Sequence, residues 1–218
     1  MDLEIDPLDQ EQDLWWIFYL GDSLSWQNIK KLFSAFEIAG LVTVGQHVDL
    51  VDLSETFQMI FKDTQYNMCI ECLRTEDSSC FYLGANTFNV LPADSVEVRL
   101  AADRFLEYGK LCYHIFNPVY ALAQNLNVYL ATDDVLSSQL THIFWSQIFG
   151  PNFVNTFGRE ILVNAPGWRN ENLGDGGLLY VLASSPYCYK GNSQYWQDAR
   201  DYFTKLGRPD ILWSDKPS

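Results

Sequence analysis

The most continuous apolar stretch of the chain is LWWIFYL, at residues 14–20. A strand that is covered on both faces is apolar at every position, so this run predicts a strand in the middle of a sheet. Gly21 ends the run, and Ser23 is placed to cap a helix that ends at Gly40. The buried face of that helix follows the i, i+3, i+4, i+7 spacing: Ile29, Leu32, Phe33 and Phe36.

The next pattern is an alternation of apolar and polar positions, typical of a half-buried strand. Residues 41–53 alternate in this way, and Gly45 marks a bulge or a tight turn within them. Ser54 is placed to cap a short helix that carries Phe57, Ile60 and Phe61. Residues 67–73 and 80–85 are then expected to form a hairpin around the acidic turn TEDSS.

A long helical pattern begins near residue 94, where Asp94-x-x-Glu97 has the form of a capping box. Its apolar residues recur at helical spacing: Val98, Ala102, Phe105, Cys112, Phe116, Val119 and Ala123. Pro118 lacks the N–H that would bond to His114. This segment is therefore either one kinked helix or two helices that meet at Asn117.

A further helix is predicted to begin after Asp133 and Asp134, whose side chains can cap it. One face carries Leu136, Leu140, Ile143, Phe144 and Ile148. Trp145 falls roughly 180° from Leu136 on the helical wheel, so the helix would have apolar groups on two faces. Gly150 and Pro151 end it, and a short helical turn then runs to Gly158.

The last part of the chain is expected to form a strand at residues 161–164, a loop at 166–177 and a strand at 178–184. Ser193 begins a final helix, which Gly207 and Pro209 close. This order predicts an α+β protein with one antiparallel or mixed sheet packed with helices. Residues 1–13 would be an acidic N-terminal segment and residues 14–218 a single domain.

The charge of the chain is strongly negative and uneven. With 48% hydrophobic residues the chain is globular in composition, and its net charge is −14. Residues 1–109 hold 19 acids and 6 bases, whereas residues 110–218 hold 9 acids and 8 bases. Such a field repels phosphate backbones, which argues against nucleic-acid binding, and it would steer a basic partner into contact. The simpler explanation is solubility alone.

The N-terminus and the apolar runs predict a cytoplasmic protein. The first 13 residues carry six acids and no base, the reverse of a secretory signal. The longest apolar run has seven residues, whereas a membrane span needs about 20. We therefore expect no membrane partner.

Cysteine usage argues against both disulfides and a metal site. Five cysteines are an odd number for a disulfide framework. Zinc needs about four ligands, and a strand sends Cys69 and Cys72 to opposite faces, so core cysteines are the better interpretation. We expect no cofactor.

No catalytic constellation is recognisable. Cys112 and His114, two residues apart on a helix, point to different sides. Asp133 and Asp134 could bind a metal, but capping already explains them. Asp175, in a Gly-Asp-Gly-Gly turn, is expected to bond its own backbone.

Several motifs resemble a known family. They are Ile143-Phe144-Trp145, Phe149-Gly150-Pro151 with Val154, Gly158-Arg159-Glu160, Asn164-Ala165-Pro166 and Asp175-Gly176-Gly177-Leu178-Leu179. Together they resemble the immunity protein 52 family and related type VI immunity families of bacterial polymorphic toxin systems, most firmly over residues 135–185. The structural motif would consist of Trp145, Gly150, Pro151, Gly158, Gly176 and Gly177.

The resemblance implies a non-enzymatic antidote that binds and neutralises a cognate protein toxin, often a nuclease. A basic nuclease cleft would suit an acidic inhibitor. Because the motifs run through Trp145, we expect Trp145 to be buried. The candidate contact residues are then Asp133, Asp134, Trp168, Glu171 and Asp175. The alternatives are an intracellular scaffold or complex subunit of the same fold without a toxin partner, and a hydrolase that uses Asp133, Asp134 or Asp175.

Overall fold

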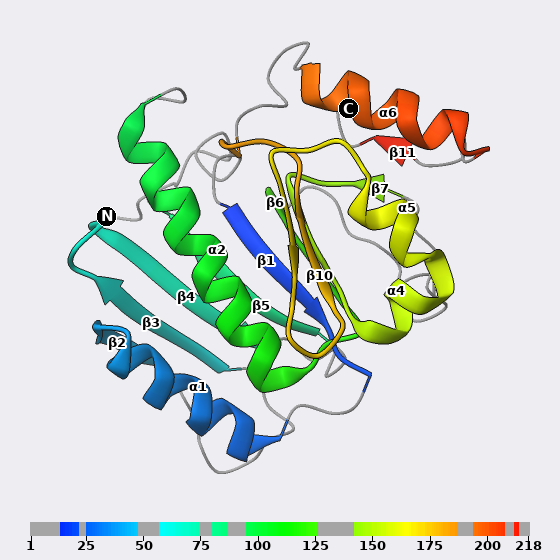
Figure 1. The fold of residues 1–218 in the computed structure, drawn as a ribbon. Coiled ribbons are helices and arrows are strands. Elements are labelled where there is room, and N and C mark those ends of the chain that lie inside the picture. Colours follow the sequence, from blue (N-terminus) through cyan, green and yellow to red (C-terminus); the bar gives the residue numbers. More distant parts are fainter. Residues whose placement is uncertain are drawn as a thin grey trace.

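The computed structural model describes residues 14–21, 25–47, 57–74, 80–86, 95–125, 142–186, 194–207 and 212–213. Nine strands form one antiparallel sheet (Figure 1), in the order β2-β3-β4-β5-β1-β6-β8-β10-β9. Their bounds are β1 Leu14–Tyr19, β2 Leu41–His47, β3 Phe57–Asp63, β4 Met68–Arg74, β5 Cys80–Ala85, β6 Tyr120–Asn125, β8 Ser146–Phe149, β9 Arg169–Asn172 and β10 Leu178–Val181. Two short strands, β7 (His142–Ile143) and β11 (Leu212–Trp213), pair in parallel.

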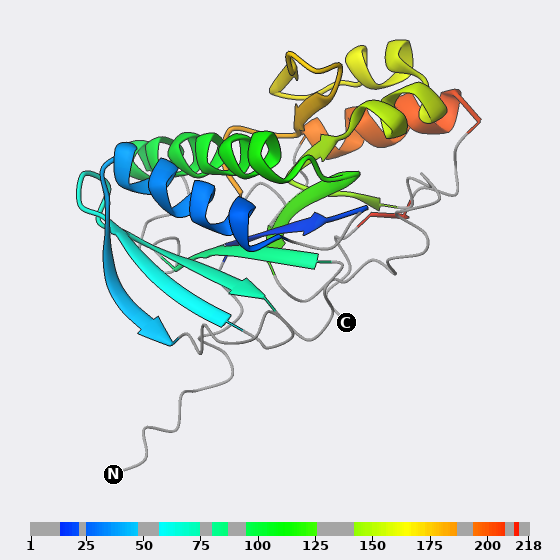
Figure 2. The ribbon, with the colours of Figure 1, turned by 90° about the horizontal axis from the view of Figure 1, so that it is seen from below.

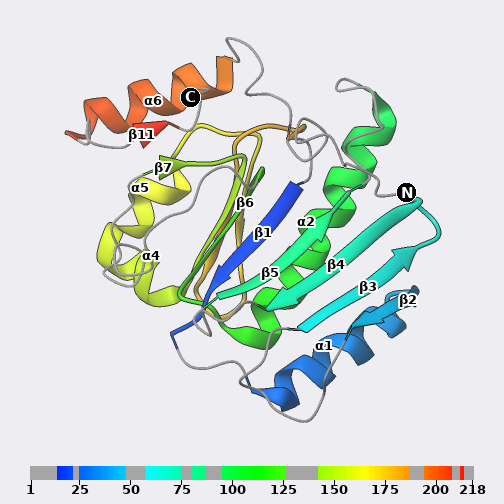
Figure 3. The ribbon, with the colours of Figure 1, turned by 180° about the vertical axis from the view of Figure 1, so that it is seen from behind.

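Five helices accompany the sheet in the described part of the chain: α1 Trp26–Ile38, α2 Val96–Phe116, α4 Pro151–Phe157, α5 Arg159–Val163 and α6 Gln194–Lys205. The sheet curves around α1 and α2, and α4, α5 and α6 lie on the outer side of its other half (Figure 2). Seen from behind, β3, β4 and β5 have no described helix across them (Figure 3). The α+β fold predicted from the sequence is confirmed, and its sheet is antiparallel.

Strand β1 is central, as its unbroken apolar run predicts. It pairs with β5 on one side and with β6 on the other. Trp16 and Phe18 pack under α1 and α2, whereas Ile17 and Tyr19 belong to the core on the opposite face. Every position of the strand therefore needs an apolar side chain, so apolar and polar residues do not alternate along it.

Helix α2 lies directly on β1. The indole N–H of Trp16 donates to the carbonyl of Phe105 at 3.2 Å. A Cβ on Gly109 would lie 2.4 Å from the same indole, so only glycine allows this close approach. The cap of α2 is Ser95, whose hydroxyl accepts from the N–H of Val98, whereas Asp94 lies outside the described residues.

The prediction of a helix that continues beyond Pro118 is wrong. Helix α2 ends at Phe116, and Asn117 takes the left-handed conformation with φ 49°. The N–H of Val119 then donates to the carbonyl of Tyr19, which begins the pairing of β6 with β1. A proline and a left-handed residue together turn the chain from the helix layer into the sheet.

The predicted helix before Gly150 is wrong over residues 142–149, which form β7 and β8; its earlier residues lie outside the described ranges. All four residues of β8 are buried, because α2 covers one face and α4 lies on the other. The apolar residues that the helical wheel placed on two faces of a helix are thus explained by a strand that is covered on both faces. Trp145 is buried, as predicted, and its indole N–H donates to the carbonyl of Ala183 at 2.8 Å.

Two other short elements have the opposite type of secondary structure from the one predicted. The helix predicted after Ser54 is wrong over residues 57–61, because β3 turns Met59, Phe61 and Asp63 toward the helices in alternation. The strand predicted at residues 161–164 is wrong, because these residues belong to α5 and the turn after it. Helix α1 is capped by Ser25, and Ser23 lies outside the described residues.

Other predictions are confirmed: helix α1 with its end at Gly40, the β4–β5 hairpin, α4 with its end at Gly158, and α6. The predicted loop at residues 166–177 contains the edge strand β9. Residues 1–13 and the predicted cap at Asp133 and Asp134 lie outside the described residues.

Candidate interaction surface

One face of α2 runs beside the edge strand β9. The residues of this face lie within about 80° on the helical wheel: Val96, Leu100, Asp103, Glu107 and Lys110. Ionic contacts join the two elements, since Arg169 lies 3.9 Å from Asp103 and 3.7 Å from Glu107, and Lys110 lies 3.0 Å from Glu171. We call these five residues, with Arg169 and Glu171, the α2–β9 seam.

Glu171, a predicted contact residue, lies in the middle of the seam. Its carboxylate accepts hydrogen bonds from Lys110 and from Arg169. Partial burial alone raises the pKa of Glu171, but the bonds from Lys110 and Arg169 outweigh burial and hold that pKa below its ordinary value. The negative charge of Glu171 is therefore paired within the chain and mainly fixes β9 to α2.

Asp175, another predicted contact residue, holds the turn that follows β9. One carboxylate oxygen accepts from the N–H of Gly177 at 2.9 Å, as the Gly-Asp-Gly-Gly pattern predicts. The other accepts from the hydroxyl of Tyr113 at 2.8 Å. Burial, together with this bond to Asp175, raises the pKa of Tyr113 well above its ordinary value. Asp175 thus connects the turn to α2.

Some of the motifs that resemble the immunity families meet at the Gly-Asp-Gly-Gly turn, although they are far apart in sequence. Arg159 donates to the carbonyl of Gly176, whose own Cβ would lie 3.9 Å from Pro151. Gly150 donates to the carbonyl of Val119 at 2.9 Å, and a Cβ on Gly150 would lie 2.7 Å from that oxygen.

The backbone at two of these glycines requires glycine. Gly176 has φ 98° and Gly158, between α4 and α5, has φ 113°, values that other residues rarely adopt. Trp145 lies outside this cluster, in the core beside Ala183. The glycines of the structural motif are therefore explained by backbone geometry and close packing.

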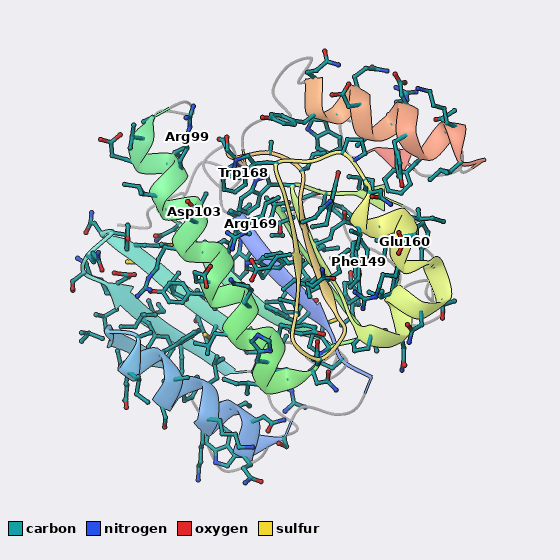
Figure 4. All side chains as sticks on the ribbon, viewed as in Figure 1. Arg99, Asp103, Phe149, Glu160, Trp168 and Arg169 are labelled. Carbon is teal, nitrogen blue, oxygen red and sulfur yellow. The ribbon has the colours of Figure 1, made fainter. Side chains whose placement is uncertain are left out.

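Trp168, another predicted contact residue, directly precedes β9. Strand β9 runs along α2 in the direction of increasing residue number, because Arg169 reaches Asp103 and Glu171 reaches Lys110. Side chains alternate along a strand, and Asn170 donates to the carbonyls of Val163 and Ala165 on the side away from α2, so the side chain of Trp168, two residues earlier, belongs to that side as well. Figure 4 labels Arg99, Asp103, Trp168 and Arg169 in this region. Exposed fractions are large for apolar side chains: 65% for Val96, 49% for Leu100 and 38% for Trp168.

The sequence pattern identified Trp168, Glu171 and Asp175 but not the α2 half of the seam. A signal existed, since Val96 and Leu100 are apolar residues that do not belong to the predicted buried face of their helix. Asp133 and Asp134 lie outside the described residues, so the structure does not place them relative to the seam.

The excess negative charge is not carried by the described elements. The ranges that the structure describes hold 11 acids and 11 bases, a net charge of zero. The other residues hold the remaining 17 acids and 3 bases, which is the whole net charge of −14. Six of these acids precede Leu14, the first residue of β1.

A separate cavity of about 440 Å³ lies at the end of α2, near the starts of α1 and α4. Its lining includes the carboxamide residues Asn28, Asn117 and Asn152, together with Phe116 and Pro151. None of the described residues that line it is charged.

Metal ligands do not gather within the described ranges, where no group of three His, Cys, Asp or Glu residues could hold a metal ion. The cysteines at 69, 72 and 112 are free thiols. Burial raises the pKa of the thiols of Cys72 and Cys112 well above the ordinary value.

None of the helices in the described part of the chain has the length and apolar character that crossing a membrane requires. None of the protein-family models, curated proteins or solved structures compared with the chain matches it.

Proposed function

We propose that this protein is an immunity protein that binds a cognate bacterial toxin with a basic active cleft, such as a nuclease, and neutralises it in the cytoplasm. The observation that carries the proposal is the charge distribution. Charge-balanced helices and strands hold the fold, while all of the excess −14 lies in the other residues of the chain. The resemblance of residues 135–185 to immunity families supports the same proposal.

The physical argument concerns the rate of association. A nuclease attracts phosphates with a basic cleft, and an acidic inhibitor is drawn to the same field. Complementary charge raises association rates up to roughly 10⁸–10⁹ M⁻¹s⁻¹ at low salt, against about 10⁵–10⁶ without steering. An antidote that must reach its toxin before the toxin reaches nucleic acid gains most from the association rate.

The proposal is tested with a candidate toxin domain encoded by a neighbouring gene. We expect the two purified proteins to form a stable complex in low salt, and the complex to lack the toxin's activity. Absence of both a complex and inhibition would overturn the proposal.

The steering argument is tested by neutralising N-terminal acids. Asp6→Asn, Asp9→Asn and Glu11→Gln together should slow association and flatten its salt dependence. The matched control neutralises three exposed acids of the second half, with Glu160→Gln, Asp198→Asn and Asp201→Asn. An equal effect of both triple variants would contradict steering by the N-terminal acids.

A further inference from the structure

We infer that the cavity at the C-terminal end of α2 receives an arginine side chain of the basic partner and binds its guanidinium group. This inference rests on the proposed function and names a group that the toxin would supply. The cavity volume of about 440 Å³ lies within the range of roughly 300–1,000 Å³ that is typical of ligand pockets.

The first reason is the set of carbonyl groups at the end of α2. The carbonyls of a helix point toward its C-terminal end, and the last ones have no donor within the helix. Asn117 donates to the carbonyl four residues before it. The next two carbonyls, those of His114 and Ile115, lack the donors that a continuing helix would provide. Pro118 has no N–H, and the N–H of Val119 donates to strand β1 instead.

The second reason is charge. The aligned peptide groups of the 21-residue helix give its C-terminal end a negative charge of roughly half an elementary charge. None of the described residues that line the cavity is basic, so none of them repels a cation. None of them is acidic either, which favours arginine over lysine, because a guanidinium is more weakly hydrated than an ammonium and loses less when it leaves water.

The third reason is the carboxamide groups of the lining. Asn28 belongs to α1, Asn117 ends α2 and Asn152 belongs to α4. Their side chains form no hydrogen bond with any described residue, and each offers an oxygen as an acceptor. A guanidinium has five N–H donors and no acceptor, so it can bond several carboxamide and carbonyl oxygens at once.

Rigid backbone holds these acceptors in place. Pro118 and Pro151 line the cavity, and the ring of a proline fixes its φ angle. Gly150 lies so close to Pro118 and Val119 that a Cβ would be 2.7 Å from both carbonyl oxygens. Asn117 has a left-handed backbone with φ 49°. Little conformational entropy remains to be lost when a side chain enters here.

The first experiment titrates the full chain with N-acetylarginine N-methylamide and follows the side-chain amide signals of Asn117 and Asn152 by NMR. We expect saturable shifts with a Kd on the order of 1–10 mM. The citrulline analogue has the same shape without the charge and should bind about 5-fold or more weakly, and the lysine analogue should also bind more weakly. Equal binding of the citrulline analogue would overturn the cation site, and equal binding of the lysine analogue would overturn its assignment to arginine.

Variants of the lining test the position of the site. Asn152→Asp adds a carboxylate and should tighten binding of the arginine compound about 10-fold, whereas Ser34→Asp, at an exposed site of α1 outside the lining, should change it less than about 2-fold. Asn117→Gly removes a carboxamide where the left-handed backbone suits glycine, and should weaken binding about 3- to 10-fold. Equal effects of the two aspartate variants would place the site elsewhere.

The affinity of the full chain for a candidate toxin domain separates this inference from the proposed function. Asn152→Lys places a cation in the cavity and should weaken the complex about 10-fold or more, whereas Ser34→Lys should change it less than about 2-fold. If the unaltered protein binds and inhibits the toxin and Asn152→Lys binds within 2-fold of it, the arginine site is overturned and the immunity function stands. If the unaltered protein neither binds nor inhibits, the immunity function is overturned, and the assignment of the arginine to a toxin falls with it.

Discussion

The hydroxyl of Tyr113 lies directly over Gly177, where a Cβ atom would be only 2.1 Å from the hydroxyl oxygen. The same hydroxyl donates to Asp175, two residues earlier in the turn. A side chain of any size on Gly177 must therefore displace Tyr113, break its bond to Asp175 or move the turn away from α2. This contact is where the Gly-Asp-Gly-Gly turn is fixed to the longest helix.

Gly177→Ala should lower the free energy of unfolding by about 1 to 3 kcal/mol, the usual cost of overpacking. Gly174→Ala, in the same turn, is the matched control, since no atom lies within 4 Å of its added Cβ. Tyr113→Phe in the Gly177→Ala background removes the oxygen that clashes and should recover part of the loss. Urea denaturation measures all three, and equal stabilities of the two alanine variants would contradict the close contact.

The second prediction concerns Asp63, which is buried at the end of β3. Its carboxylate accepts hydrogen bonds from Arg104, Tyr108 and the backbone N–H groups of Gln65 and Tyr66, while Arg104 also donates to the carbonyl of Ala39. The group thus joins α1, α2 and the β3–β4 turn.

Asp63→Ala should cost about 2 to 4 kcal/mol, because it leaves Arg104 and two backbone donors without their acceptor. Asp63→Asn keeps an acceptor oxygen and should cost less, which chemical denaturation can measure. If the alanine variant were no less stable than the asparagine variant, the carboxylate would not hold these elements together.

Acid should weaken the protein through Asp63 and Glu171. Burial opposes ionisation of both groups, but hydrogen bonds from Tyr108 and Arg104, and from Lys110 and Arg169, hold their pKa values below the ordinary 3.8 and 4.5. A carboxylate with a lowered folded-state pKa adds stability above its unfolded-state pKa, and that stability is lost as the pH falls through the folded-state pKa. The unfolding temperature should therefore fall between about pH 5 and pH 3.

Glu171→Gln should remove the part of this pH-dependent stability that comes from the pairing of Glu171 with Lys110 and Arg169. At pH 7 the variant should be less stable by about 0.5 kcal/mol, a small value because the pair is partly exposed. Its stability should approach that of the unaltered protein below pH 4. A difference that stays constant from pH 7 to pH 3 would show that Glu171 is not held ionised by its partners.

Trp145 provides a comparison between a buried and an exposed tryptophan. Trp145→Phe removes the indole N–H that bonds Ala183 and leaves that buried carbonyl without its donor, so it should cost about 1 to 3 kcal/mol. Trp168→Phe makes the same chemical change at an exposed site and should stay within about 0.5 kcal/mol. Thermal unfolding of both variants tests the difference, and a Trp145→Phe protein as stable as Trp168→Phe would contradict it.

Where one physical rule dominates, the sequence predicts the structure well. The all-apolar run of β1 requires cover on two faces, and the i, i+3, i+4, i+7 pattern of α1 allows only one buried stripe. The apolar pattern does not identify β8 as a strand, because a short strand that is buried on both faces and a helix with two apolar faces have the same run of apolar residues. It fails at β3 because Phe57, Ile60 and Phe61 also fit helical spacing, while the sheet uses Met59 and Phe61.

The interaction surface could be predicted only in part for a related reason. Trp168, Glu171 and Asp175 lie within eight residues of one another, so one polar loop identifies them. Their α2 partners Lys110 and Tyr113 are about 60 residues away in sequence, and only the curvature of the sheet brings β9 beside α2. The same curvature decides that the charges of Glu171 and Asp175 are paired internally, leaving Trp168 as the exposed member.

The most direct test of the central claim is growth of bacteria that co-express this protein with a candidate toxin encoded by a neighbouring gene. The immunity function predicts that induction of the toxin alone stops growth and that co-expression of this protein restores it. If the unaltered protein, expressed at levels above the toxin, leaves growth arrested, the protein is not its antidote.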